Sequence, residues 1–121
     1  LQGCKGLGAD LSRSKLTNTA LRDCVLRAVN WDGASLEKLV LRDCDLSESW
    51  LTECRLKQLE LEDCTLTQTN FFRTPLAGMD FTRCRLSGLV CTENGAELKG
   101  AIVTPEQAVE LARLLGLIIR P

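Results

Sequence analysis

Large apolar residues recur every five positions along most of this chain, and this period limits the folds open to it. We call these positions the centres: Leu11, Leu16, Leu21, Leu26, Trp31, Leu36, Leu41, Leu46, Leu51, Leu56, Leu61, Leu66, Phe71, Leu76, Phe81 and Leu86. A small or apolar residue stands two places before each centre, as Ala34 does before Leu36. A period of five fits neither the 3.6 residues of a helical turn nor the two-residue alternation of a long strand. It predicts a backbone that turns a corner every five residues, with both series pointing inward.

A second period of 20 residues is nested in the first. Leu-Arg-Asp-Cys at residues 21–24 returns at 41–44 and, with Glu in second place, at 61–64. Four pentads therefore make one coil with four faces. Stacking such coils about 4.8 Å apart buries the inner column and pairs the backbone amides. Leu1 already lies on the series of centres, so we expect further N-terminal coils to be missing from this sequence.

The five-residue register breaks at residues 92–95. The next centre is Leu98 rather than position 96, so two residues are inserted before a last pentad at 96–100. We therefore divide the chain at residue 103: residues 1–103 form the solenoid, and residues 104–121 form a C-terminal unit that caps it.

The residues after 103 predict a short helix. Thr104 suits the N-cap, Pro105 suits the first helical position, and Gln107 completes a capping box with Thr104. Gly116 is placed to end the helix. We expect residues 117–119, Leu-Ile-Ile, to form a short strand.

The tandem pentads resemble the pentapeptide-repeat family, whose repeat is often summarised as A(D/N)LXX. Residues 9–13, Ala-Asp-Leu-Ser-Arg, match that summary at every position. The likeness covers about residues 1–103. It implies an all-β solenoid, a right-handed quadrilateral parallel β-helix, with a short C-terminal capping helix.

The C-terminal end is similar to that of the Qnr and MfpA branch of the family. In that branch a last pentad leads into a short helix, a Leu-Gly pair and an apolar tail, as at 97–100, 107–108, 115–116 and 117–119 here. The resemblance implies a protein that binds DNA gyrase, a type II topoisomerase, by mimicking duplex DNA, and so modulates quinolone or toxin action. It also implies a homodimer formed through the C-terminal helix.

All seven cysteines fall at inward positions, namely Cys4, Cys24, Cys44, Cys54, Cys64, Cys84 and Cys91. Free cysteine is a small and commonly buried hydrophobic residue. Parallel Cβ atoms about 4.8 Å apart fit a disulfide poorly. The odd count and the absence of a visible signal peptide favour a reducing, cytoplasmic location. Neither a histidine nor a CxxC pair accompanies them, so we expect core residues and no metal or cofactor.

Composition argues against several classes of function. Without histidine, a serine or cysteine nucleophile lacks its usual base, so we do not expect an enzyme. The formal net charge of −1 predicts no direct binding of nucleic acid or of a membrane surface. No apolar run approaches the roughly 18 residues of a membrane span.

Outward carboxylates gather on the face centred on Leu21, Leu41 and Leu61. We call this set the acidic face: Asp23, Asp43, Glu60, Glu62, Asp63 and Asp80. One interpretation is that the acidic face mimics phosphates and binds a protein. The other is that its carboxylates pair with arginines of neighbouring coils, each pair being worth little. Residues 1–95 hold 12 Lys and Arg against 13 Asp and Glu, whereas a DNA mimic is expected to be clearly acidic. The alternative function is therefore a rigid scaffold or adaptor that binds another protein.

A neighbouring face carries large apolar residues at outward positions, namely Trp50, Phe72 and Val90. They are a candidate contact surface, or they pack under the C-terminal segment. Trp31 is large for an inward column, so we expect it in the core beside a local widening, with a partner for its indole N–H.

The apolar arc of the C-terminal helix is too wide for a single contact. We expect the last coil to cover Ala108, Leu111, Ala112 and Leu115. The surplus surface predicts a homodimer about a two-fold axis. Its candidate interface is Val109, Leu111, Leu114, Leu115 and Ile118.

Overall fold

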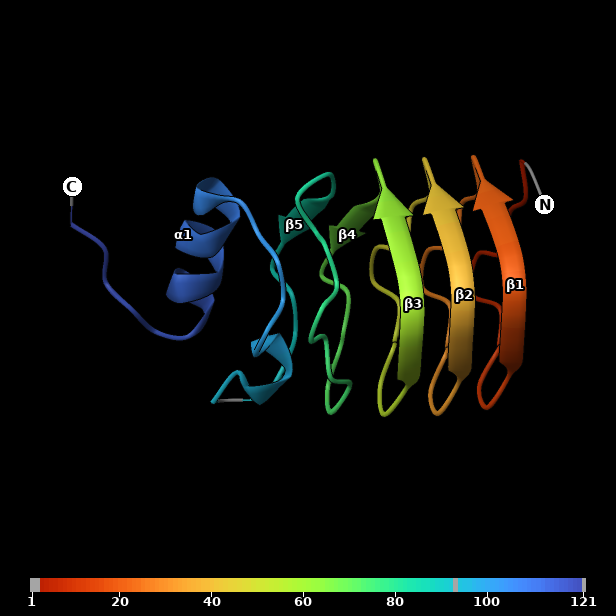
Figure 1. Cartoon of the computed structure of the whole chain (residues 1–121), viewed down its shortest axis with the longest axis horizontal. Helices are drawn as coiled ribbons and strands as arrows, with labels where there is room; N and C mark the ends of the chain where they lie inside the picture. Colours follow the sequence, from red (N-terminus) through yellow and green to blue (C-terminus); the bar gives the residue numbers. More distant parts are fainter. Residues whose placement is uncertain (1–2, 93, 121) are drawn as a thin grey trace.

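The computed structural model of the chain, which describes residues 3–92 and 94–120, is a parallel β-solenoid of about four turns with one short C-terminal helix. Figure 1 shows the coils stacked along the long axis, with the chain termini at opposite ends and the helix at the C-terminal end. The β-helix expected from the five-residue period is confirmed.

The β-strands form two parallel sheets. They are β1 (Lys15–Arg22), β2 (Ser35–Arg42), β3 (Arg55–Glu62), β4 (Thr65–Thr67) and β5 (Arg85–Ser87). Strands β1, β2 and β3 form one parallel sheet in that order, and β4 pairs in parallel with β5. Leu16 lies opposite Leu36, and Leu36 opposite Leu56, so each coil takes 20 residues as the nested period predicts.

The corners between pentads are made by residues with left-handed backbone conformation. Asp23, Asp43 and Asp63 have φ angles of 54°, 52° and 53°. This conformation costs a residue other than glycine about 1–2 kcal/mol. The backbone N–H of each of these three residues donates to a carbonyl of the next coil, as that of Asp43 does to Glu62 at 3.0 Å. The acidic column therefore runs along one corner of the solenoid.

Small inward residues satisfy their polar atoms on the preceding coil. The Ser49 hydroxyl donates to the carbonyl of Leu26 at 2.7 Å, and the Cys54 thiol donates to that of Trp31 at 3.0 Å. Inward hydroxyl and thiol groups therefore fit a core lined mostly by leucine. Trp31 is buried as expected, but within the described residues its indole Nε1 has no hydrogen-bond partner.

The cysteines are free thiols, and most of them lie in this core. Five are buried, namely Cys24, Cys44, Cys54, Cys64 and Cys84. Cys4 and Cys91, near the two ends of the solenoid, are half-buried. Burial raises the pKa of Cys84 to about 11, which keeps that sulfur protonated at neutral pH.

The two inserted residues lengthen the last coil, as the register break predicts. Asp80 bridges to Ile102, a separation of 22 residues rather than 20. The last pentad contains the 3-10 helix η1 (Ala96–Leu98), in which Leu98 is only half-buried. Leu98 packs against the core as the register predicts, and its neighbour Glu97 is also buried, at 4% exposed.

Glu97 is held by donors from two segments. Its carboxylate accepts the backbone N–H of Arg73 at 2.8 Å, the backbone N–H of Thr92 at 2.9 Å and the Thr92 hydroxyl at 2.7 Å. Burial by itself would raise the pKa of Glu97, but these hydrogen bonds outweigh it and lower the pKa below its usual value. The ionised carboxylate therefore joins the inserted loop to the preceding coil.

Helix α1 (Pro105–Leu114) begins as predicted. The capping box between Thr104 and Gln107 is formed in both directions, and Pro105 is the first helical residue. The Gln107 amide also donates to the carbonyls of Phe81 at 2.7 Å and Cys84 at 2.9 Å, which fastens the helix to the last coil.

Two expectations for the C-terminal segment are wrong, namely the strand at residues 117–119 and the set of helix residues covered by the last coil. Gly116 donates to Arg113 and Leu117 to Ala112, each at 3.0 Å, a pair of bonds that closes the helix and turns the chain outward. Residues 117–119 consequently run away from any strand edge, and they form no strand. Ala108 and Leu115 are exposed rather than covered by the last coil.

Candidate protein-binding face

The acidic column is real in the structure. Asp23, Asp43 and Asp63 occupy the same corner on successive coils, which stack about 4.8 Å apart. They line a shallow groove of about 590 Å³ that also contains Arg83 and Arg85. A regular row of carboxylates therefore stands beside two guanidinium groups at one end.

Part of the acidic face is neutralised by cross-coil ion pairs. Arg42 Nε lies 2.9 Å from Glu62 Oε2, and Arg83 contacts Asp63 at 3.1 Å and Glu62 at 3.7 Å. Exposed pairs of this kind contribute roughly 0–1 kcal/mol each. At Glu62 and Asp63 the ladder interpretation is therefore correct.

Three other carboxylates of the acidic face, those of Asp43, Glu60 and Asp80, make no ion pair in the part of the chain that the structure describes. The Asp80 carboxylate accepts the Thr82 hydroxyl at 2.6 Å and the Thr82 N–H at 2.8 Å, and both bonds lower the pKa of Asp80. These three groups can accept cationic groups from a partner.

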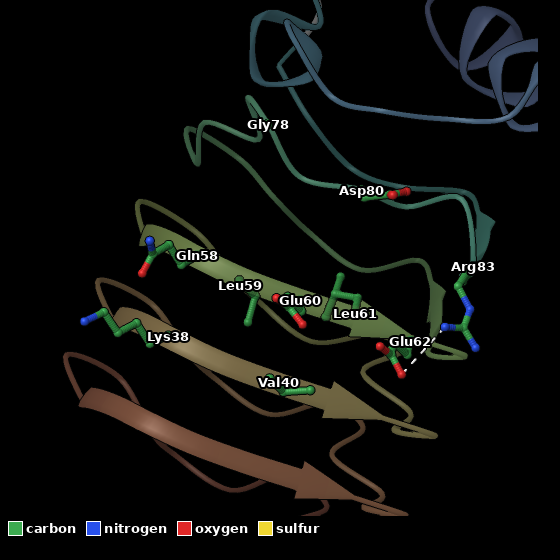
Figure 2. Close-up of a pocket in the computed structure, with 10 residues that line it drawn as sticks. All are labelled: Lys38, Val40, Gln58, Leu59, Glu60, Leu61, Glu62, Gly78, Asp80 and Arg83. Carbon is green, nitrogen blue, oxygen red and sulfur yellow. Dashed lines mark ion pairs between the residues drawn. The ribbon is translucent and has the colours of Figure 1, made fainter.

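A cleft of about 800 Å³ opens between β3 and the segment that contains Gly78 and Asp80. Figure 2 shows Leu59, Glu60, Leu61 and Glu62 along β3, with Asp80 on the far side of the opening and Arg83 closing one end by its ion pair to Glu62. Glu60, Glu62 and Asp80 therefore line one cleft instead of lying on a flat surface.

Sequence reasoning missed this cleft, although Pro75 signals it. The N–H of Ser35 donates to Ser14 at 2.8 Å, and the N–H of Arg55 donates to Ala34 at 2.9 Å. Pro75 holds the next position in that series and has no N–H to continue it. The hydrogen-bonded sheet on this face ends at β3, directly before that position.

The outward apolar residues Trp50, Phe72 and Val90 are 46%, 37% and 43% exposed. Packing under the C-terminal segment, one of the two expectations for them, is therefore wrong. Trp50 and Val90 bridge to Asn70 from its two sides, and the Arg73 guanidinium lies 5.1 Å from the Phe72 ring centre. Their role as a contact surface stays a prediction.

Helix α1 divides the residues of the predicted dimer interface. Leu111 is 9% exposed and is buried in the core of its own protomer. The others are exposed, namely Val109, Leu114, Leu115 and Ile118. The surface left for a second copy is therefore the outer side of α1 and the tail after it.

Other kinds of site find little support among the described residues. Residues 3–92 and 94–120 contain no group of three or more His, Cys, Asp or Glu residues that could hold a metal ion. None of the helices in these ranges has the length and apolar character of a membrane span.

Comparison with known proteins agrees with this fold. The family model for pentapeptide repeats matches residues 20–58 and 51–88. A trypsin-treated variant of QnrB1, a plasmid-mediated fluoroquinolone resistance protein, aligns with a TM-score of 0.55 at 14% identity, covering 99% of this chain and 79% of that chain. Full-length QnrB1 aligns with a TM-score of 0.52 at 19% identity, covering 97% and 68% respectively. No curated protein matches the sequence. At these identities the likeness establishes the solenoid architecture.

Proposed function

This chain belongs to the pentapeptide-repeat family, and from that membership we propose that it is a non-enzymatic binding protein whose acidic face occupies a protein surface that otherwise holds DNA. The partner we propose is DNA gyrase, and the consequence is altered sensitivity to quinolones or toxins. The likeness to QnrB1, a fluoroquinolone resistance protein, supports the proposed link to quinolones.

The observation that carries the proposal is a set of three carboxylates that make no ion pair among the described residues. Asp43 stands on the corner column, and Glu60 and Asp80 stand on the cleft beside it. A DNA-binding surface presents Lys and Arg side chains to phosphates. Asp43, Glu60 and Asp80 can receive such side chains without first breaking an ion pair to another described residue.

The second candidate function is a rigid scaffold or adaptor for another protein. The ion pairs of Arg42 and Arg83 favour it, because they consume the charges of Glu62 and Asp63. Under this interpretation the acidic face stiffens the stack of coils, and binding uses another surface such as the one at Trp50 and Val90.

A charge-reversal experiment separates the two functions. The double variant Asp43→Lys/Glu60→Lys changes two exposed carboxylates that make no ion pair with any described residue. The double variant Glu48→Lys/Glu53→Lys is a matched control with the same change of net charge on other pentads, where the ion pairs of 3.6 and 3.7 Å are weak. Inhibition of supercoiling by purified gyrase should be lost in the first variant and kept in the second. A parent protein without effect on gyrase, or equal inhibition by both variants, would favour the scaffold.

We also propose that residues 104–121 act as a capping and dimerisation unit. Leu111 and the Gln107 amide attach α1 to the last coil. Leu114 and Ile118 remain 40% and 86% exposed, which is a high exposure for apolar side chains at one end of the molecule. A two-fold contact between two such ends would bury them and produce a longer rod.

A further inference from the structure

Strand β3 has a free edge in the middle of the solenoid. Elsewhere the N–H of residue i donates to the carbonyl of residue i+19 on the next coil, as Leu26 does to Asp45 at 2.8 Å. On β3 the described residues show no such bond from three N–H groups, those of Leu56, Gln58 and Leu61. Those amides therefore face the cleft.

The burial of β3 agrees with this assignment. The inward leucines of β2, Leu36 and Leu39, are 3% and 1% exposed. Their counterparts on β3, Leu56 and Leu59, are only half-buried. This exposure repeats that of β1, which lies at the N-terminal end of the sheet.

The opposite wall of the cleft is a second strand-like edge. The segment after Pro75 bonds towards the C-terminus instead, with Leu76 donating to Glu97 at 3.0 Å and Gly78 to Gly100 at 2.9 Å. Its side towards β3 makes no backbone bond among the described residues. The cleft thus lies between two parallel edges, each with unused backbone groups.

We propose that this cleft binds an extended, basic segment of a protein partner, which adds as a strand between β3 and the segment after Pro75. Addition of a strand to a free edge supplies main-chain hydrogen bonds, and alternate side chains supply specificity. Inward side chains of the segment would meet Leu59 and Leu61, and outward ones would meet Glu60 and Asp80. The occupant therefore alternates apolar residues with Lys or Arg.

Charge selects this occupant over the alternatives. Glu60 and Asp80 lie on opposite sides of the cleft and make no ion pair among the described residues. Glu62, in contrast, already pairs with Arg42 and Arg83. The cations Lys38 and Arg83 also line the cleft, but its three carboxylates outnumber them and disfavour an acidic segment. A second copy paired edge to edge would bring like charges of the two β3 strands together, which is unfavourable. The inference rests on the proposed function only in taking the partner to be a protein.

Hydrogen exchange followed by NMR tests the proposal without gyrase. The probe is an eight-residue peptide of alternating Lys and Val, as long as β3. In the free protein the amides of Leu56, Gln58 and Leu61 should exchange at least about tenfold faster than the corresponding amides of β2. Saturating peptide should slow them to the rate of β2. If they are already as slow as those of β2 in the free protein, the edge is closed and the proposal is wrong.

Two controls separate strand addition from simple charge attraction. The same peptide with N-methyl groups at alternate residues keeps its charge but loses backbone donors, and it should not bind. Glu60→Lys should weaken binding about fivefold, the scale of one exposed ion pair, while Glu48→Lys should leave it unchanged. Equal binding of the methylated peptide would overturn the proposal. So would amide protection that rises with protein concentration alone, because it would assign the cleft to a second copy. Gyrase inhibition that survives failure of the peptide test would leave the proposed function standing.

Discussion

Replacing Glu97 by alanine should loosen the last coil. The change removes the acceptor for the backbone N–H groups of Arg73 and Thr92, which lie 2.8 and 2.9 Å from the carboxylate. A buried donor left without an acceptor costs about 1–3 kcal/mol. Both donors are partly buried, and the Thr92 hydroxyl can turn to water, so we expect a total loss of about 2–4 kcal/mol. That is a large fraction of the roughly 5–15 kcal/mol that stabilise a domain.

The contribution of Glu97 should depend on pH with a defined sign. Hydrogen bonds hold its pKa in the folded protein below the value in the unfolded chain. The unfolded chain therefore binds more protons at acidic pH, and stability falls as the pH drops from the usual Glu pKa through the lowered folded pKa. Above the usual pKa the contribution is complete. Glu97→Gln keeps one acceptor oxygen, so it should lose less stability than Glu97→Ala and lack this acid dependence.

Urea titration and hydrogen exchange measure both effects. The amides of Leu76 and Gly78 donate to the carbonyls of Glu97 and Gly100, so they report on the last coil directly. Their exchange should accelerate by about 30-fold or more in Glu97→Ala, the equivalent of about 2 kcal/mol. Glu60→Ala is the matched control and should change nothing, because this exposed carboxylate makes no ion pair with a described residue. A Glu97→Ala variant within about 0.5 kcal/mol of the parent would refute this reasoning.

Three further predictions concern the core, the cap and the assembly. In the native protein a bulky thiol reagent should label the half-buried Cys91 before the buried Cys64. Denaturation should make all seven thiols reactive. Rapid labelling of Cys64 in the native protein would contradict its place in the core. Gln107→Ala should lower the stability of the docked helix by about 1–2 kcal/mol, because two carbonyls of the last coil lose their donor. Hydrogen-exchange protection of the α1 amides measures this loss. Unchanged protection would show that the contact is dispensable. Leu114→Glu with Ile118→Glu should convert a dimer into a folded monomer in sedimentation experiments; a parent that sediments as a monomer at tens of micromolar would disprove the dimer.

Much of this architecture could be predicted from the order of the residues. Each centre must face inward wherever it stands, so the rule that places Leu21 also places Leu41 and Leu61, and the same repetition stacks Asp23, Asp43 and Asp63. The capping box at Thr104 is equally local, because both of its hydrogen bonds span three residues. Features that depend on one pentad or one helical turn can be predicted from the sequence, because the residues that interact in them are close together along the chain.

The remaining features depend on which coil lies next to which. Pro75 removes one donor, but the place of the segment after it depends on bonds to the lengthened last coil, such as that from Leu76 to Glu97. Glu97 looks like an ordinary surface carboxylate until the fold brings Arg73, 24 residues away, within 2.8 Å of it. Residues 117–119 have the composition of a strand, yet a strand needs an adjacent edge, and the turn at Gly116 leads them away from one. Each of these outcomes depends on hydrogen bonds between segments distant in sequence, whose geometry exists only after the coils have stacked.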